Sequence, residues 1–305
     1  MNRQQFLNLS KITALGLAIN GTPFRLLASN RQDEGNMLVL IHLKGGNDGL
    51  NTVIPLDRYD TLANVRKNIL PAKNAIIKLD DNTGLHLSMT GIKSMYDNGM
   101  LNIVQGVGFE YSCFTHAAAT RIWMNGSNTA DTMYWKGCRI MNAADTLDVQ
   151  LNKVADVISR GDDIKVYVVT LDGFDTHTNQ YDKHAALLGE LSVNVQSFFK
   201  TAKAKGFSNR VVTMTFSEFG RRIKSNTYGG TDHGTAAPVM LFGEHVKAGI
   251  TGAGPEIPAD ATMEDNLPVL TDFRSIYSDI ATNWLGRNPA TATGTSLQLF
   301  DNHYG

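Results

Sequence analysis

The segment MLVLIHLKGGNDGLNTV, residues 37–53, constrains the fold more than any other part of the sequence. Its apolar run over residues 37–44 has the length of a strand buried on both faces, which is typical of sheets covered by helices. The run stops at two glycines, and Asp48 follows closely. Asn-Asp-Gly is ordinary turn chemistry, but open α/β sheets also bind ligands at the carboxyl ends of their strands. Asp48 is therefore either a turn residue or a ligand.

Further strands alternate with helices along the chain. Apolar or β-branched runs predict strands at residues 101–105, 164–171, 210–216 and 237–243. Helices are expected from Thr115 onward, over residues 182–203 and over residues 272–286, whereas residues 126–158 show little periodicity. This alternation predicts an α/β fold with a mostly parallel central sheet flanked by helices. We expect one such domain over residues 29–305.

The composition narrows the class of partner. The chain has 305 residues, 42% of them hydrophobic, which is enough for a sizeable core. Its formal net charge is -1 and no basic block is present, which argues against nucleic acid as a partner. No segment has the length of a membrane span. The expected partner is a small-molecule or polymer substrate.

The amino terminus, MNRQQFLNLSKITALGLAIN, has a basic start and a short, weakly apolar stretch. It predicts an export signal over residues 1–28, similar to a twin-arginine signal in which Gln4 replaces the second arginine. The protein would then be periplasmic or extracellular; a disordered or helical N-terminal arm is the alternative. Cys113 and Cys138 form no CxxC pair, and they would be either one disulfide or two free thiols.

Polar clusters lie beside four of the expected strands: GGNDG, LDGFDTHTNQ, SEFGR and GGTDHGT. In a parallel sheet the first three would lie along one edge, and the fourth would enter from the adjoining loop. Such a concentration of carboxylates requires a cation to offset their repulsion. Mixed imidazole and carboxylate ligands favour zinc, manganese or iron over magnesium or calcium. The residues that would converge are Asp48, Asp172, Asp175, His177, Glu218, Asp232 and His233.

Each candidate also has a purely structural interpretation. Asp172 and Asp175 flank Gly173 and could form a turn, and Asp232 could cap a turn or a helix. The remaining alternatives are an ion pair of Glu218 with Arg221 or Arg222, core packing for His42, capping or packing for His86, and a solvent-exposed position for His184.

The motifs resemble the domain of unknown function 1501 (DUF1501) family over about residues 37–287. They are LVLIHLKGGNDGLNTV, GLHLSM, THAAATRIW, GFDTHTNQ, TFSEFGR, GGTDHGTAAPV and TDFRSIYSDIATNWLG. That family is grouped with the alkaline phosphatase and sulfatase superfamily, whose members are α/β enzymes with bound divalent metals. The resemblance implies an alkaline phosphatase-like fold and one or two metal ions, with zinc or manganese favoured.

The resemblance also implies individual roles. Thr115, at the start of a helix, would be the nucleophile, with Ser112 in reserve, and Arg121 would contact the substrate anion. The implied metal ligands are Asp48, Asp175, His177, Glu218 and His233, with Asp172 and Asp232 as further candidates. Two departures stand out: Phe219 replaces a histidine that superfamily enzymes commonly carry, and the sulfatase motif Cys-x-Pro-x-Arg is missing around Cys113.

Two functions from different classes follow. The first is an exported metal-dependent hydrolase of phosphate or sulfate esters. The second is a secreted binding or accessory protein whose alkaline phosphatase-like site is degenerate, as Phe219 suggests. A serine hydrolase built on Ser217, His233 and an aspartate is a third interpretation, although TFSEFG does not supply the G-x-S-x-G elbow that such enzymes use. Whether the chain is an enzyme stays open at the level of sequence.

Overall fold

The computed structural model describes residues 35–110, 115–126, 138–286 and 296–301, together with two short paired strands near the amino terminus. These strands, β1 (Ala18–Ile19) and β2 (Thr22–Pro23), pair antiparallel within the segment expected to be an export signal. The rest of that segment lies outside the described residues, so export stays a prediction. In the described part of the chain, no helix combines the length and apolar character that a membrane crossing requires.

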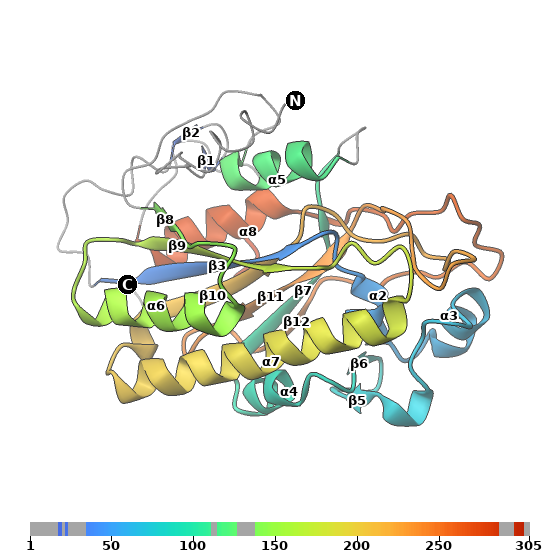
Figure 1. Cartoon of the computed structure of the whole chain (residues 1–305), viewed down its shortest axis with the longest axis horizontal. Helices are drawn as coiled ribbons and strands as arrows, with labels where there is room; N and C mark the ends of the chain where they lie inside the picture. Colours follow the sequence, from blue (N-terminus) through green and yellow to red (C-terminus); the bar gives the residue numbers. More distant parts are fainter. Residues whose placement is uncertain are drawn as a thin grey trace.

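An eight-stranded sheet forms the centre of the molecule (Figure 1). Its strand order is β12-β7-β11-β10-β3-β9-β8, and β13 pairs with β7. The strands are β3 (Met37–Lys44), β7 (Leu101–Gly108), β8 (Cys138–Ile140), β9 (Val166–Asp172), β10 (Val211–Phe216), β11 (Ala237–Phe242), β12 (Gly249–Thr251) and β13 (Thr271–Asp272). The strand expected at residues 37–44 is confirmed as β3, and the other expected strands are found with ends shifted by up to three residues.

The sheet is mixed, which corrects the expectation of a mostly parallel one. β3 is parallel to both β9 and β10, but β11 is antiparallel to both β10 and β7. The reason lies in the connection: a parallel pair needs a crossover that returns the chain to the starting end, and residues 217–236 contain no helix to provide it. The chain therefore re-enters the sheet from the edge at which β10 ended. That edge is the carboxyl end of β3, β9 and β10.

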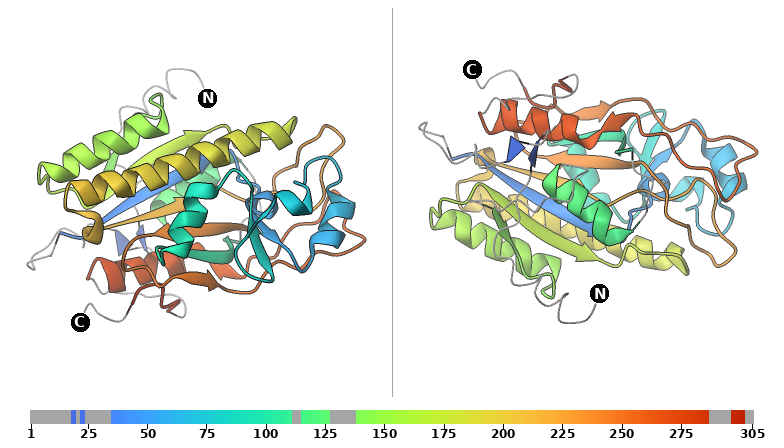
Figure 2. Two further views of the ribbon diagram at one scale, coloured as in Figure 1. Left: turned by 90° about the horizontal axis from the view of Figure 1, so that it is seen from below. Right: turned by 90° about the horizontal axis from the view of Figure 1, so that it is seen from above.

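Helices cover both faces of the sheet (Figures 1 and 2). One face carries α4 (Thr90–Asp97), α6 (Leu147–Ser159) and α7 (Gln180–Ala204), and the other carries α5 (His116–Asn125) and α8 (Phe273–Asp279). The helix expected over residues 272–286 is thus divided, because α8 continues into the π-helical η4 (Ile280–Trp284). No helix was predicted where α6 lies, within a stretch expected to be irregular.

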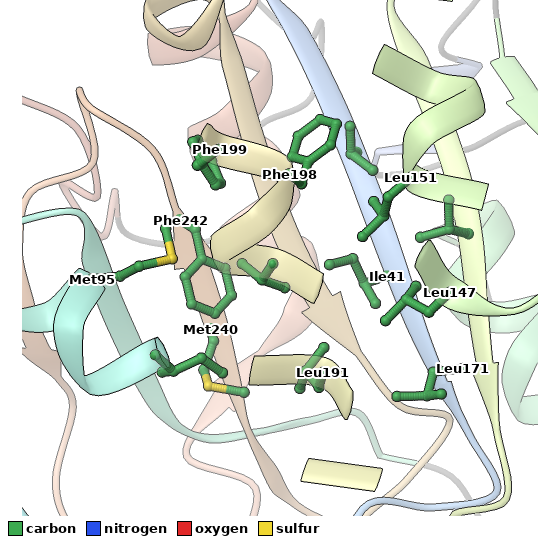
Figure 3. Close-up of a cluster of buried hydrophobic side chains, with 14 of the residues drawn as sticks. Ile41, Met95, Leu147, Leu151, Leu171, Leu191, Phe198, Phe199, Met240 and Phe242 are labelled. Carbon is green, nitrogen blue, oxygen red and sulfur yellow. The ribbon is translucent and has the colours of Figure 1, made fainter. Parts of the chain in front are cut away.

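The alternation of side chains along β3 builds two separate cores. Leu38 and Leu40 pack in the cluster under α5 and α8, whereas Val39 and Ile41 pack in the cluster under α6 and α7. Figure 3 shows part of the second cluster, where Ile41, Leu191, Phe198, Met240 and Phe242 lie between the sheet and the long helix α7. The central strands are buried on both faces, as the apolar run predicted.

Smaller elements cluster near the carboxyl edge and beside α7. A three-stranded antiparallel sheet has the order β4-β6-β5. The elements are α2 (Gly49–Thr52), β4 (Val53–Pro55), α3 (Tyr59–Val65), η2 (Lys73–Ala75), β5 (Ile77–Lys78), β6 (Thr83–Leu85) and η3 (Ser208–Arg210). α2 begins at Gly49, the last residue of the first polar cluster, so the first expected site segment is fixed between a strand and a helix.

Candidate metal centre

Four segments bring polar side chains together at the carboxyl edge of the sheet. The loop after β9 supplies Asp175 and His177, and the residues that follow β10 supply Glu218. The segment before β11 supplies His233, which reaches the same edge because β11 runs in the opposite direction. The first turn of α5 supplies His116.

Three imidazoles surround the carboxylate of Asp175. His177 Nε2 lies 3.0 Å and His233 Nε2 3.1 Å from Asp175 Oδ1, and His116 Nε2 lies 3.5 Å from Oδ2. The Nε2 atoms of His177 and His233 are 3.0 Å apart. Ligand atoms that share a tetrahedral zinc ion at 2.0–2.1 Å lie roughly 3.3–3.4 Å from one another. The spacing therefore fits a single metal ion, with His116, Asp175 and His233 offering ligand atoms within 4.8 Å of each other.

Carboxylates orient two of these imidazoles. Glu218 Oε1 lies 2.8 Å from His116 Nδ1, and Asp232 Oδ1 lies 3.0 Å from His177 Nδ1. A ring whose Nδ1–H donates to a carboxylate presents a bare Nε2, which is the usual arrangement of metal-binding histidines. The bare Nε2 of His177 lies 3.0 Å from Asp175 Oδ1, and the lone pairs of these two atoms repel unless a proton or a cation lies between them. The donor set thus suits a divalent cation.

Arg221 ties the segments of the centre together. Its guanidinium, with a fully buried side chain, donates to Asp175 Oδ1 at 2.8 Å. It also donates to four backbone carbonyls, those of Gly45, Gly46, Phe174 and Thr231, at 2.5–2.9 Å. Since these carbonyls come from the loops after β3 and β9 and from the segment before β11, one side chain fixes the relative positions of three loops.

The ionisation of these groups follows their partners. The hydrogen bond to Glu218 raises the pKa of His116 above its usual range. Burial alone would raise the pKa of Glu218, but hydrogen bonds from His116 and His42 lower it strongly. For Asp175, burial is likewise opposed by hydrogen bonds from His233 and Arg221, and its pKa is lowered. Both carboxylates are therefore ionised at neutral pH, as a cation site requires.

Asp48 and Asp172 do not lie in this cluster. The Asp48 side chain is fully buried, and its Oδ2 accepts from Arg66 Nη1 at 2.5 Å and from the side chain of Gln180. Asp172 forms an exposed ion pair with Lys44 at 2.5 Å. Of the residues expected to converge, the structure brings together Asp175, His177, Glu218, Asp232 and His233.

The proposed nucleophile lies beside the centre. Thr115 is the N-cap residue of α5, directly before His116, and it is exposed with no capping hydrogen bond from its side chain. Arg121 is exposed on the same helix. Ser112 and Cys113 lie outside the described residues, so the reserve nucleophile stays a prediction. Cys138 is a free thiol in the structure, which agrees with the second of the two alternatives for the cysteines.

Other sequence interpretations are corrected by the structure. His184 is 1% exposed, not solvent-exposed, because it shares the buried face of α7 with Leu188 and Leu191. Glu218 pairs with two histidines rather than with an arginine. Ser217 Oγ donates to the Leu43 carbonyl at 2.7 Å and accepts from the Asn47 amide at 2.8 Å, so its hydroxyl is engaged by the backbone. This placement does not favour a serine hydrolase.

Sequence reasoning missed two residues of the centre. His116 follows the expected nucleophile in the motif THAAATRIW, and its place in the first turn of a helix at the site was a usable signal. His42 was assigned to the core; it is 6% exposed and stacks on Phe216, but its Nε2 also lies 3.0 Å from Glu218 Oε2. Nothing in the sequence of β3 distinguishes this contact from simple packing.

Phe219 forms an apolar wall of the centre. Its ring centroid lies 5.0 Å from that of His116 and 4.4 Å from that of His233. It is 5% exposed. Phe219 therefore packs against two of the metal-binding candidates.

Fold and site together define an α/β protein with a candidate mononuclear metal centre at one edge of a mixed sheet. Residues 149–275 match the sequence model of a family described as "Protein of unknown function (DUF1501)". The expected resemblance to this family is confirmed over that stretch. No curated protein matches the sequence significantly.

Several solved structures overlap with the fold at low sequence identity. Murine ectonucleotide pyrophosphatase/phosphodiesterase 5 in complex with AMP is 9% identical, with 87% of this chain and 100% of that chain covered and a TM-score of 0.42. The C-terminal periplasmic domain of EcEptC from Escherichia coli is 10% identical, with 90% of each chain covered and a TM-score of 0.44. The lipoteichoic acid synthase LtaP from Listeria monocytogenes is 9% identical, covering 96% and 81%, with a TM-score of 0.39. At these values none of the three carries an inference about activity.

Proposed function

We propose that this protein is an exported metal-dependent hydrolase of phosphate or sulfate esters. One observation supports the proposal above all: three imidazole nitrogens lie within 3.5 Å of the oxygens of one carboxylate, Asp175. Imidazole and carboxylate ligands suit zinc or manganese. A bound ion would polarise the oxygen of a phosphoryl or sulfuryl group as a Lewis acid.

The chain's own residues would bind and orient the ester. The side chains of Asp175 and His177 are 48% and 41% exposed, so the centre is open on this side. Thr115 carries an uncapped hydroxyl at the start of α5, where the backbone amides of the first turn favour an anionic group. Attack by Thr115 Oγ on phosphorus or sulfur would form a covalent ester and release the alcohol. Water would then hydrolyse that ester.

A secreted binding protein with a non-catalytic site is the second candidate. Phe219 is the observation that favours it, because it removes one imidazole from the expected ligand set and fills space between His116 and His233. Arg221 adds to this, since its guanidinium already compensates part of the charge of Asp175. Such a protein would hold an anion or a metal without turning over an ester.

The test combines metal content with hydrolysis. Purified full-length protein would be analysed for metals, stripped with EDTA, and then supplied with zinc, manganese or magnesium. Aryl phosphate and aryl sulfate hydrolysis would be measured for the wild type and for Thr115→Ala. The matched control is Thr90→Ala, which removes an exposed threonine from the first turn of another helix, α4.

We expect zinc or manganese, but not magnesium, to restore activity that EDTA removes. Loss of a nucleophile lowers kcat by on the order of 1000-fold or more, whereas Thr90→Ala should match the wild type. Undiminished hydrolysis by Thr115→Ala would exclude Thr115 as the nucleophile. Metal uptake without hydrolysis of either ester would favour the binding protein, and failure to take up zinc or manganese would remove the metal centre from both candidates.

A further inference from the structure

We propose that Glu218 and His42 are positioning residues of the centre, which act from the core by holding the ring of His116 with its Nε2 toward Asp175. The inference rests on the proposed metal centre and gives Glu218 a role other than direct ligation. It follows from the contacts of the Glu218 carboxylate, from the burial of His42, and from the way α5 is anchored.

Both oxygens of Glu218 are already engaged by donors. Oε1 accepts from the Gly45 amide at 2.9 Å and lies 2.8 Å from His116 Nδ1. Oε2 lies 3.0 Å from His42 Nε2 and 3.4 Å from Ser217 Oγ. A carboxylate has about four lone-pair sites, and the side chain is fully buried. Because Ser217 Oγ donates its single hydrogen to the Leu43 carbonyl, three donors hold the carboxylate and Ser217 closes its remaining side. A cation would have to displace one of these neighbours to reach Glu218.

His42 holds the far side of the carboxylate. Its ring stacks on Phe216 with a centroid distance of 4.7 Å and an interplanar angle of 4°, which fixes the ring plane. It lies in β3, a central strand that pairs on both sides, so its backbone is fixed as well. A buried donor in a rigid strand keeps the Glu218 carboxylate turned toward His116. His42 thus acts on the centre through Glu218.

The helix that carries His116 is anchored to Glu218 at two points. His116 contacts the carboxylate, and Trp123, two turns further along α5, donates from Nε1 to the Glu218 carbonyl at 3.2 Å. These contacts fix the rotation of α5. With Nδ1 of His116 held by Glu218, its Nε2 is left 3.5 Å from Asp175 Oδ2, on the side where the other imidazoles lie.

A double-mutant cycle separates a positioning role from direct ligation. Zinc affinity would be titrated in EDTA-treated full-length protein for the wild type, Glu218→Gln, His116→Ala and the double variant. Loss of an outer-shell partner typically costs 10–100-fold in metal affinity, and we expect Glu218→Gln to fall in that range. In the His116→Ala background the same change should have an effect of at most about 2-fold, because Glu218 acts through a ring that is no longer there.

His42→Gln should weaken zinc binding in the same direction but less than Glu218→Gln. His86→Gln is the matched control, since His86 is buried like His42 (3% exposed against 6%) but accepts its hydrogen bond from the Ser88 amide, outside the centre. It should leave the affinity within about 2-fold of the wild type. Equal losses from Glu218→Gln with and without His116 would overturn the proposal, because Glu218 would then act on the metal by itself.

Failure of the metal centre and failure of the positioning role are distinguishable. If the wild type takes up neither zinc nor manganese, the proposed function fails, and the positioning role is tested in the metal-free protein by nitrogen NMR of the labelled imidazoles. We expect His116 of the wild type to carry its proton on Nδ1 and this preference to be lost in Glu218→Gln. If Glu218→Gln does not fold, His42→Gln serves for the same measurement. An unchanged His116 signal would overturn the proposal.

Discussion

Two aspartates at the carboxyl ends of neighbouring strands differ in burial. Asp48 follows β3 and forms a fully buried pair with Arg66, and Asp172 ends β9 and forms an exposed pair with Lys44. Removing one partner of a buried pair leaves the other charge uncompensated, whereas exposed pairs contribute little. Asp48 therefore contributes chiefly to the stability of the fold.

We predict that Asp48→Asn lowers the free energy of unfolding by about 3–5 kcal/mol. Asp172→Asn, the matched control, should leave stability unchanged within the error of measurement. Urea unfolding followed by far-UV circular dichroism would measure both. Equal midpoints for the two variants would mean that the Asp48–Arg66 pair does not contribute more than a surface pair.

The same two aspartates show how far a site can be predicted from sequence. From the rule that the carboxyl ends of parallel strands lie along one edge of a sheet, we predicted that Asp175, His177 and His233 lie close together, and they do. The rule could not show that Asp48 forms an ion pair with Arg66, because that pairing depends on where α3 ends. For His116, the helix start was visible in the sequence, but its contact with Glu218 depends on packing between segments about 100 residues apart.

At the scale of elements, the connection from β10 to β11 places His233 in the centre. This connection has two arms, the residues that follow β10 and the residues that precede β11, and they approach closely. The Gly220 amide donates to the Thr235 carbonyl at 2.9 Å, and the Gly234 amide donates to the Gly220 carbonyl at 2.8 Å. A Cβ atom added to Gly220 would lie 2.0 Å from the Ala236 carbonyl oxygen. Backbone would have to move to admit a methyl group there.

We therefore predict that Gly220→Ala lowers the free energy of unfolding by about 1–3 kcal/mol. It should also weaken zinc binding, because the displaced arm carries His233. Gly254→Ala is the control, since a Cβ there meets no atom within 4 Å. Chemical unfolding and zinc titration of both variants would test this. Wild-type zinc affinity in a folded Gly220→Ala variant would show that the crossing of the arms does not position His233.

The elements themselves were predictable to different degrees. Buried strands such as β3 and β10 stand out as apolar runs, but the direction of β11 depends on a loop of 20 residues that contains no helix. Without a recognised crossover, strand direction is not fixed by local pattern. α6 was missed although Leu147, Leu151, Val154 and Ile158 follow helical spacing. The polar residues around them obscured a signal that was present.

At the scale of the whole molecule, four buried charges of the described part of the chain gather at one end. Asp48, Arg66, Glu218 and Arg221 are each at most 1% exposed, and all lie in or next to the segments that leave the carboxyl edge of the sheet. His184 joins them through its Nε2, which lies 2.9 Å from Asn47 Oδ1. Burial lowers the pKa of His184 to about 4, so its imidazole is neutral in the folded protein at neutral pH.

This depressed pKa makes stability depend on pH in a defined window. Between about pH 4 and 6.5 the unfolded chain binds a proton at His184 that the folded protein does not bind, so unfolding becomes more favourable as the pH falls. The free energy of unfolding therefore has its full value, as far as His184 is concerned, above pH 6.5, and it falls by about 3 kcal/mol by pH 4. We predict that His184→Gln unfolds with a shallower pH dependence than the wild type in this window. Urea unfolding at pH 7 and pH 4.5 measures the difference, because carboxylates with lowered pKa values affect both proteins alike. Equal slopes would mean that His184 accepts a proton inside the fold.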